Sequence, residues 1–140
     1  MIEILYEDNH LIAVNKKSGD IVQGDKTGDT PLSDFVKEYI KKKYNKPGEV
    51  FLGTIHRLDR PTSGIVLYAR TSKALSRMNE QFREKKVQKT YWAVVENLPP
   101  NTIDTLDNYL RKNQKQNKSY VTKGDNGKHA VLEYKLLKKL

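Results

Sequence analysis

Apolar residues open the chain in two short runs. Residues 2–6 and 11–15 are rich in β-branched and other apolar side chains, and the polar residues 7–10 lie between them. Two such runs joined by a short polar segment are typical of paired strands and the turn that connects them. The chain is therefore predicted to begin with a β-hairpin.

Two later segments carry apolar residues at helical spacing. In the first, Thr30 is a candidate N-cap, Pro31 suits the first helical position, and the pattern continues to a stop at residues 46–48. The second runs from about residue 72 to residue 86, with apolar side chains on one face and polar ones on the other. Each segment is predicted to form a helix.

Three further segments, residues 64–70, 90–96 and 129–137, have the composition of strands. Both alternating faces of residues 90–96 are largely apolar, which is typical of a central strand covered on both sides. Residues 111–128, rich in Lys, Asn, Gln and Gly, are predicted to form a mobile loop or an irregular hairpin. This order of elements predicts an α+β fold, with flanking helices on a mixed or antiparallel sheet. A chain of 140 residues fits one domain spanning residues 1–140.

The composition is that of a cytoplasmic protein. The sequence contains no cysteine, so disulfides and thiolate metal sites are excluded. Its first eight residues carry acids where a secretory signal would carry basic residues, and no later stretch is apolar enough to span a membrane. We expect a cytoplasmic monomer that binds no membrane.

The charge is strongly positive and gathered in blocks. Lys and Arg number 26 against 17 acids, a formal net charge of +9, and the basic blocks are residues 41–46, 83–89 and 111–118. Clustered cations attract phosphates, so a polyanionic partner such as RNA is expected. A solvated surface without a partner would have the same composition.

The densest group of functional residue types lies within residues 53–70. Glycines bracket a polar loop that runs into a strand, and Asp59 lies between Arg57 and Arg60. Nearby positive charge favours an ionised carboxylate, the form that a nucleophile or general base requires. The same residues can equally form a structural ion pair that closes the loop.

The wording of this loop resembles a known signature. The run His56-Arg57-Leu58-Asp59, followed by Thr62-Ser63-Gly64, is similar to the H-R-L-D-x-x-T-S-G motif of the RluA family of RNA pseudouridine synthases. Residues 4–19 resemble the opening segment of that family, and residues 89–95 (KTYWAVV) resemble its K-x-Y-x-A-x-V segment. Three blocks in the family's order make a specific match over about residues 1–97.

The resemblance implies isomerisation of a specific uridine to pseudouridine in ribosomal or transfer RNA, without cofactor or metal. Asp59 matches the essential aspartate, which either attacks the ribose or uracil or removes a sugar proton. Arg57 matches the arginine that fills the gap left by the flipped uridine, and Tyr91 the tyrosine that packs against the flipped base. Lys89 and Arg60 are expected to face the RNA, whereas His56 is expected to be a structural hydrogen-bonding residue.

The family continues into a G-R-x-H-Q-I-R segment, and this chain ends before it. The 140 residues are therefore expected to be a fragment with weak or no activity of its own. The competing interpretation is a noncatalytic RNA-binding module, in which Asp59 is dispensable. A kinase catalytic loop is excluded, because no glycine-rich phosphate loop precedes His56 and no Asp-Phe-Gly follows it.

Overall fold

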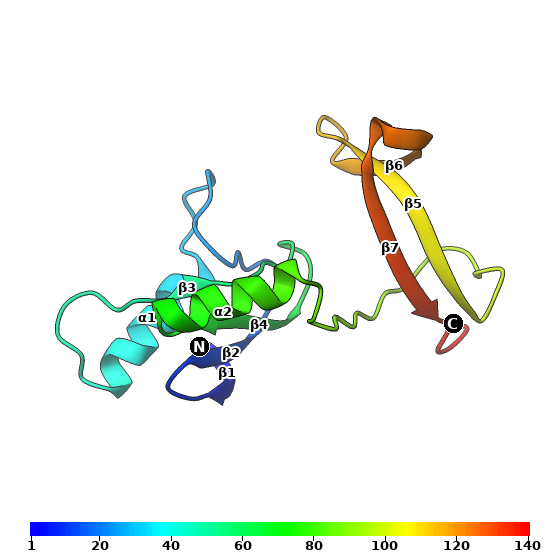
Figure 1. Cartoon of the computed structure of the whole chain (residues 1–140). Coiled ribbons are helices and arrows are strands. Elements are labelled where there is room, and N and C mark those ends of the chain that lie inside the picture. Colours follow the sequence, from blue (N-terminus) through cyan, green and yellow to red (C-terminus); the bar gives the residue numbers. More distant parts are fainter. The chain divides into compact units, whose positions relative to one another are not determined.

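The computed structural model describes the backbone of residues 1–140 and every side chain except that of Asp125. The chain divides into two compact units, Met1–Thr90 and Tyr91–Leu140 (Figure 1). Helices and antiparallel sheets are both present, which confirms the predicted α+β class. No helix among the described residues is long and apolar enough to cross a membrane.

The first unit is built on a four-stranded antiparallel sheet in the order β1-β2-β4-β3. Two helices accompany this sheet. The elements are β1 (Glu3–Glu7), β2 (Leu11–Lys16), α1 (Leu32–Lys43), β3 (Gly53–Thr54), β4 (Gly64–Ala69) and α2 (Ser72–Arg83). The predicted N-terminal hairpin, the strand over residues 64–70 and both helices are confirmed.

The helix ends differ from the predicted ones by a few residues. Pro31, and not Thr30, is the N-cap of α1, and no side chain caps it. The N-cap of α2 is Thr71, whose hydroxyl oxygen accepts a hydrogen bond from the Ala74 N–H at 3.1 Å. Such capping satisfies an amide that has no partner within the helix.

The core of the first unit lies between the sheet and α1. Alternate residues of β2 and β4 point to this side, and Val14, Val66 and Tyr68 are fully buried against Val36 of α1. The Tyr68 hydroxyl, which would be costly to bury unpaired, donates to the carbonyl oxygen of Val22 at 2.6 Å. The sequence thus fixes this sheet through strand alternation on one side and helical spacing on the other.

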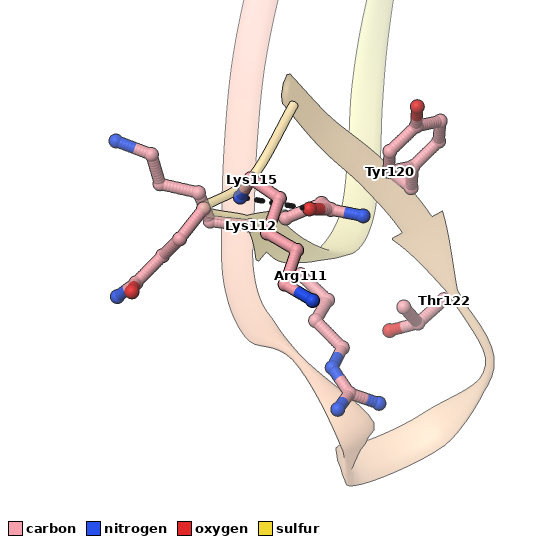
Figure 2. A pocket seen from close by; sticks show the side chains of 7 residues that line it. Arg111, Lys112, Lys115, Tyr120 and Thr122 are labelled. Carbon is pink, nitrogen blue, oxygen red and sulfur yellow. Dashed lines mark hydrogen bonds between the residues drawn. The ribbon is translucent and has the colours of Figure 1, made fainter. Parts of the chain in front are cut away.

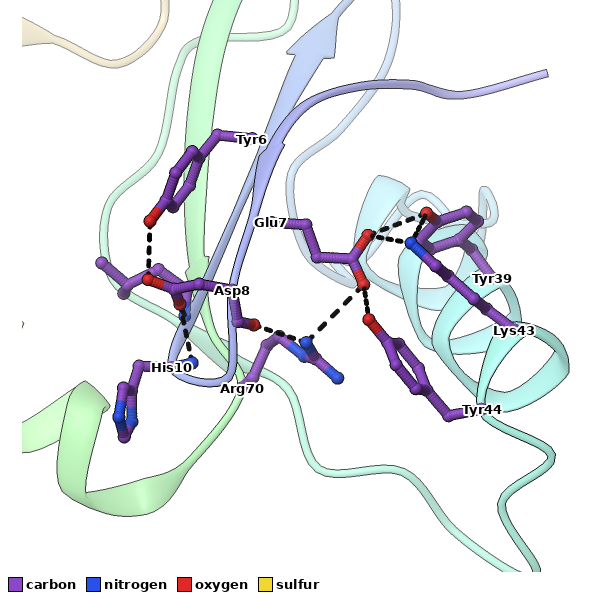
Figure 3. Close-up of polar contacts among 9 residues, drawn as sticks. Tyr6, Glu7, Asp8, His10, Tyr39, Lys43, Tyr44 and Arg70 are labelled. Carbon is purple, nitrogen blue, oxygen red and sulfur yellow. Dashed lines mark hydrogen bonds and ion pairs between the residues drawn. The ribbon is translucent and has the colours of Figure 1, made fainter.

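A polar cluster joins the first hairpin to α1 and to the end of β4 (Figure 3). The Glu7 carboxylate accepts hydrogen bonds from the Tyr39 hydroxyl at 2.8 Å, the Tyr44 hydroxyl at 2.5 Å and the Lys43 ammonium at 2.9 Å. Arg70 lies 3.6 Å from the same carboxylate. Burial alone would raise the pKa of Glu7, but the hydrogen bonds from Tyr44, Lys43 and Tyr39 outweigh it and hold that pKa below its usual value.

The second unit contains a three-stranded antiparallel sheet in the order β6-β5-β7. Its elements are β5 (Ile103–Asn113), β6 (Lys118–Thr122), a short 3-10 helix η1 (Gly124–Asn126) and β7 (Lys128–Lys135). The strand predicted at residues 129–137 is β7. Within residues 111–128, which were predicted to form a mobile loop or an irregular hairpin, β5 and β6 form a hairpin. The strands of this hairpin pair in regular register, so the predicted irregularity is wrong.

The predicted central strand at residues 90–96 is wrong. These residues form no strand in the described chain, and Trp92 and Val94 are 87% and 83% exposed. An apolar alternation becomes a strand only where a neighbouring strand offers hydrogen-bonding groups, and this segment pairs with none of the described strands. The pattern was therefore not sufficient to form the strand.

Candidate active site on the loop between β3 and β4

The loop that carries Asp59 connects two paired strands. Its ends are fixed because Gly53 and Thr54 of β3 pair with Ala69 and Tyr68 of β4. The Thr62 N–H donates to the carbonyl oxygen of Asp59 at 2.9 Å, which closes a turn with Asp59 at its first position. The Asp59 side chain is exposed on this turn.

The backbone of this turn rests on a buried ammonium group. Lys16, at the end of β2, is 0% exposed, and its Nζ donates to four carbonyl oxygens. These are Lys17 at 3.1 Å, Asp59 at 3.3 Å, Arg60 at 3.0 Å and Thr62 at 2.7 Å. Burial lowers the pKa of Lys16, and the acid Asp20 opposes that shift. A buried cation is thus satisfied by backbone dipoles of the candidate catalytic loop.

Arg60 contacts residues 19–29. Its Nε donates to the carbonyl oxygen of Gly19 at 2.9 Å, and its Nη2 lies 2.6 Å from the Asp29 carboxylate. The Gly19 N–H in turn donates to the carbonyl oxygen of Arg60 at 2.9 Å. Arg60 therefore ties the loop that carries Asp59 to residues 19–29, and its ion pair is with Asp29 and not with Asp59.

His56 has the structural contact expected of it. Its Nε2 accepts a hydrogen bond from the Leu67 N–H at 3.0 Å, and its ring stacks on Phe82 of α2 with 5.2 Å between centroids. Burial, and then the positive charge of Lys89, lowers the pKa of His56, which favours the neutral ring that can accept this bond. His56 anchors the start of the loop to β4.

The other predicted site residues are less constrained. Arg57 and Lys89 are exposed in the first unit, with Arg57 two residues before Asp59. Tyr91 is the first residue of the second unit, and its side chain is 58% exposed. Among the described residues, no three His, Asp or Glu side chains are grouped so as to hold a metal ion.

Sequence reasoning missed Lys16. A signal was present, because Ile12, Val14 and Lys16 are alternate residues of one strand and so point to one face. A lysine on the buried face of a strand must find hydrogen-bond acceptors, which marks it for attention. Three of its four acceptors are backbone carbonyls 43 to 46 residues away, which cannot be recognised from residue types.

The tip of the second unit has a polar and basic surface (Figure 2). Arg111 of β5 lies directly opposite Tyr120 of β6 in the register of the two strands. Around this pair is a hollow of about 480 Å³. It is lined by Arg111, Lys112, Asn113, Gln114, Lys115, Tyr120 and Thr122. A guanidinium, two ammonium groups and an aromatic ring are thus presented together.

The family pattern described as RNA pseudouridylate synthase matches residues 10–140. The chain belongs to this family. Relatives in the family include the ribosomal large subunit pseudouridine synthase C of Buchnera aphidicola subsp. Acyrthosiphon pisum, 39% identical over 137 residues, which cover 97% of this chain and 42% of the relative. The protein of the same name from Vibrio vulnificus is 38% identical over 136 residues, covering 97% and 41%.

A solved structure of the RNA pseudouridylate synthase family has the same fold. Human RNA pseudouridylate synthase domain containing 4 superimposes with a TM-score of 0.75 at 25% identity, over 95% of this chain and 52% of that one. The chain thus spans about two fifths of the curated relatives' length (42% and 41%) and about half of the human structure.

Proposed function

We propose that the protein isomerises a specific uridine in RNA to pseudouridine, with Asp59 as the catalytic residue. The observation that carries the proposal is an exposed carboxylate on a turn whose backbone is tied down, in a chain that belongs to the RNA pseudouridylate synthase family. The relatives are named for the large ribosomal subunit, which favours ribosomal over transfer RNA as the substrate.

The chemistry needs one ionised carboxylate and a base taken out of its stack. Asp59 either attacks the ribose or the uracil or removes a sugar proton, and each route breaks the bond between N1 and C1′. The uracil turns, C5 bonds to C1′, and the proton lost from C5 balances the one gained at N1. Because product and substrate contain the same atoms, the reaction consumes no oxidant, reductant or second substrate.

The remaining site residues act on the RNA in this proposal. Arg57, exposed beside Asp59, fills the gap in the helix when the uridine flips out. The Tyr91 ring stacks on the flipped uracil. Lys89 faces the RNA backbone near the start of the loop, where its charge already acts on His56. Arg60 reaches a phosphate only in competition with Asp29.

We assign the wider RNA contact to the β5–β6 hairpin. Arg111, Lys112 and Lys115 supply charges for phosphates, and Tyr120 supplies a flat ring on which a base can stack. Figure 2 shows these side chains around the hollow.

The test compares the full-length natural protein with its Asp59→Asn variant. Both are expressed in a strain that lacks the enzyme, and pseudouridines in ribosomal and transfer RNA are mapped by carbodiimide-based sequencing. The expected result is one site that appears with the natural protein and disappears with the variant. A site that persists in the variant refutes the role of Asp59. If neither protein yields a site but both bind RNA equally, a noncatalytic RNA-binding module is the better description.

A further inference from the structure

We propose that Lys16 is a positioning residue for the candidate catalytic loop. Its ammonium group holds the turn that carries Asp59 by donating to the carbonyl oxygens of that turn. The catalytic consequence of this inference rests on the proposed function, whereas the role of Lys16 in holding the turn does not. Because Lys16 is fully buried, it cannot contact the RNA itself, and it acts on the reaction only through Asp59.

The contacts of Lys16 are concentrated on this turn. Three of its four acceptors are the carbonyl oxygens of Asp59, Arg60 and Thr62, at 3.3, 3.0 and 2.7 Å. An ammonium group has three protons, so three to four acceptors satisfy it fully. The turn that carries Asp59 is therefore the main binding partner of this cation.

The backbone of Lys16 is held in a paired strand. Lys16 is the last residue of β2, which pairs with β4 through six residues, and it lies opposite Gly64 in that register. The neighbouring inward residues of β2, Ile12 and Val14, are both 0% exposed. A charge carried by a central strand is fixed relative to the sheet, and through the carbonyls it fixes the turn relative to the same sheet.

The carbonyl oxygens that Lys16 binds are also used elsewhere. The Asp59 carbonyl oxygen accepts the Thr62 N–H, and the Arg60 carbonyl oxygen accepts the Gly19 N–H, each at 2.9 Å. Without the ammonium, the four carbonyl oxygens would lose their shared donor, and those of Asp59 and Arg60 would keep only these backbone hydrogen bonds, so the turn would be held less firmly. These two amides therefore report on the loop independently of any reaction.

Lys16 also differs from a neutral donor in its charge. Burial is the largest influence on its pKa and lowers it, and the charge of Asp59 is among the smaller influences that oppose this shift. A neutral donor can hold the carbonyl oxygens but carries no charge.

Two variants and a matched control separate positioning from general stability. Lys16→Met keeps the length of the side chain without its donors, and Lys16→Gln keeps a donor without the charge. The control is Val36→Ala, which removes buried volume from α1 in the core of the same unit and removes none of the hydrogen bonds of the loop. All are made in the full-length natural protein, and their Tm values are measured first.

The first readout is hydrogen exchange at the amides of Gly19 and Thr62. At an equal loss of Tm, Lys16→Met is expected to accelerate hydrogen exchange at both amides by about tenfold or more relative to Val36→Ala. The reason is that the loop can then open locally, without unfolding of the whole unit. If both amides exchange equally fast in the two variants, the positioning role is overturned. Should Lys16→Met fail to fold, Lys16→Gln takes its place in the same comparison.

The second readout is catalytic. Lys16→Met is expected to lower the single-turnover rate of pseudouridine formation by about 100-fold while the RNA Kd changes by less than about threefold, since a misplaced group costs rate and not affinity. Lys16→Gln should fall between them, and Val36→Ala should keep the rate. A rate loss no larger than that of Val36→Ala overturns the inference. An inactive natural protein would instead overturn the proposed function, while the exchange data would still decide on positioning.

Discussion

Arg60 is bound to Asp29 and not to Asp59. Its Nη2 lies 2.6 Å from the Asp29 carboxylate, and its Nε donates to the carbonyl oxygen of Gly19. Arg60, which directly follows Asp59 in the sequence, is thus held by residues 19–29. Asp59 therefore keeps its exposed carboxylate free of that partner, as a nucleophile or base should. The same ion pair gives residues 19–29 a fixed place beside the candidate active site.

The ion pair of Arg60 and Asp29 should affect RNA binding more than stability. Both side chains are about half exposed (47% and 53%), so Asp29→Asn is expected to change the free energy of unfolding by less than about 1 kcal/mol. If Arg60 also serves RNA, removing the competing carboxylate should tighten RNA binding, and Arg60→Ala should weaken it. Denaturant unfolding and RNA titration measure the two quantities, and equal Kd values for both variants would remove Arg60 from the RNA surface.

The Glu7 cluster should make stability depend on pH in the acid range. The pKa of Glu7 is held below its unfolded value, so its contribution is complete above that ordinary value, near 4.5, and is lost as pH falls through the folded pKa. At pH 7, Glu7→Gln is expected to cost about 1 to 3 kcal/mol, because the hydrogen bonds lose their charge. Urea unfolding at pH 7 and pH 3 should show a smaller pH effect in the variant.

Asp8 must be controlled for in that experiment. Its pKa is also lowered, to about 2, chiefly by the hydrogen bond from the Tyr6 hydroxyl and then by the N–H groups of Leu11 and His10. It titrates in an overlapping range with the same sign. The comparison is therefore made in an Asp8→Asn background as well, and a pH effect that is unchanged by Glu7→Gln in that background would contradict the role of Glu7.

His56 should titrate below the ordinary value of histidine. Burial is the main cause and the charge of Lys89 the second, so Lys89→Met should move the pKa of His56 back toward 6.5. Because the folded pKa is lowered, the stability that neutral His56 contributes is present above the unfolded pKa and is lost as pH falls through the folded one. Titration of the imidazole signals by NMR measures the shift. An identical midpoint in both proteins would show that Lys89 lies too far away.

Local patterns predicted the first unit well, and the second poorly, for physical reasons. The apolar run in residues 11–15 and the helical spacing after Pro31 are short-range signals, and both elements formed as predicted. Strand β5 was missed because Asp104, Asp107 and Asn108 are poor strand formers, and pairing with β6 and β7 outweighs that preference. Residues 90–96 had the right composition for a strand and no partner among the described strands.

The candidate site shows the same division. Asp59 and Arg57 were predicted from their resemblance to a motif, which is a local pattern. The support of the Asp59 turn by Lys16 was not predicted, because Lys16 binds backbone carbonyls far along the chain. The carboxylate that pairs with Arg60 also depends on the path of residues 19–29, which cannot be predicted from a short-range sequence pattern.

The β5–β6 hairpin should carry much of the salt dependence of RNA binding. Lys112→Gln combined with Lys115→Gln removes two charges from the hollow around Tyr120, and the matched control, Lys41→Gln with Lys46→Gln, removes two exposed charges at the end of α1. Both variants have the same net charge, so any difference reflects position. If each hairpin lysine contacts a phosphate, the slope of the logarithm of the RNA association constant against the logarithm of salt concentration should become shallower by about 0.7 to 0.9 for each lysine removed from the hairpin. The slope should remain unchanged for the control. The measurement is RNA titration at a series of salt concentrations, and equal slopes in the two variants would show that the hairpin is solvated surface.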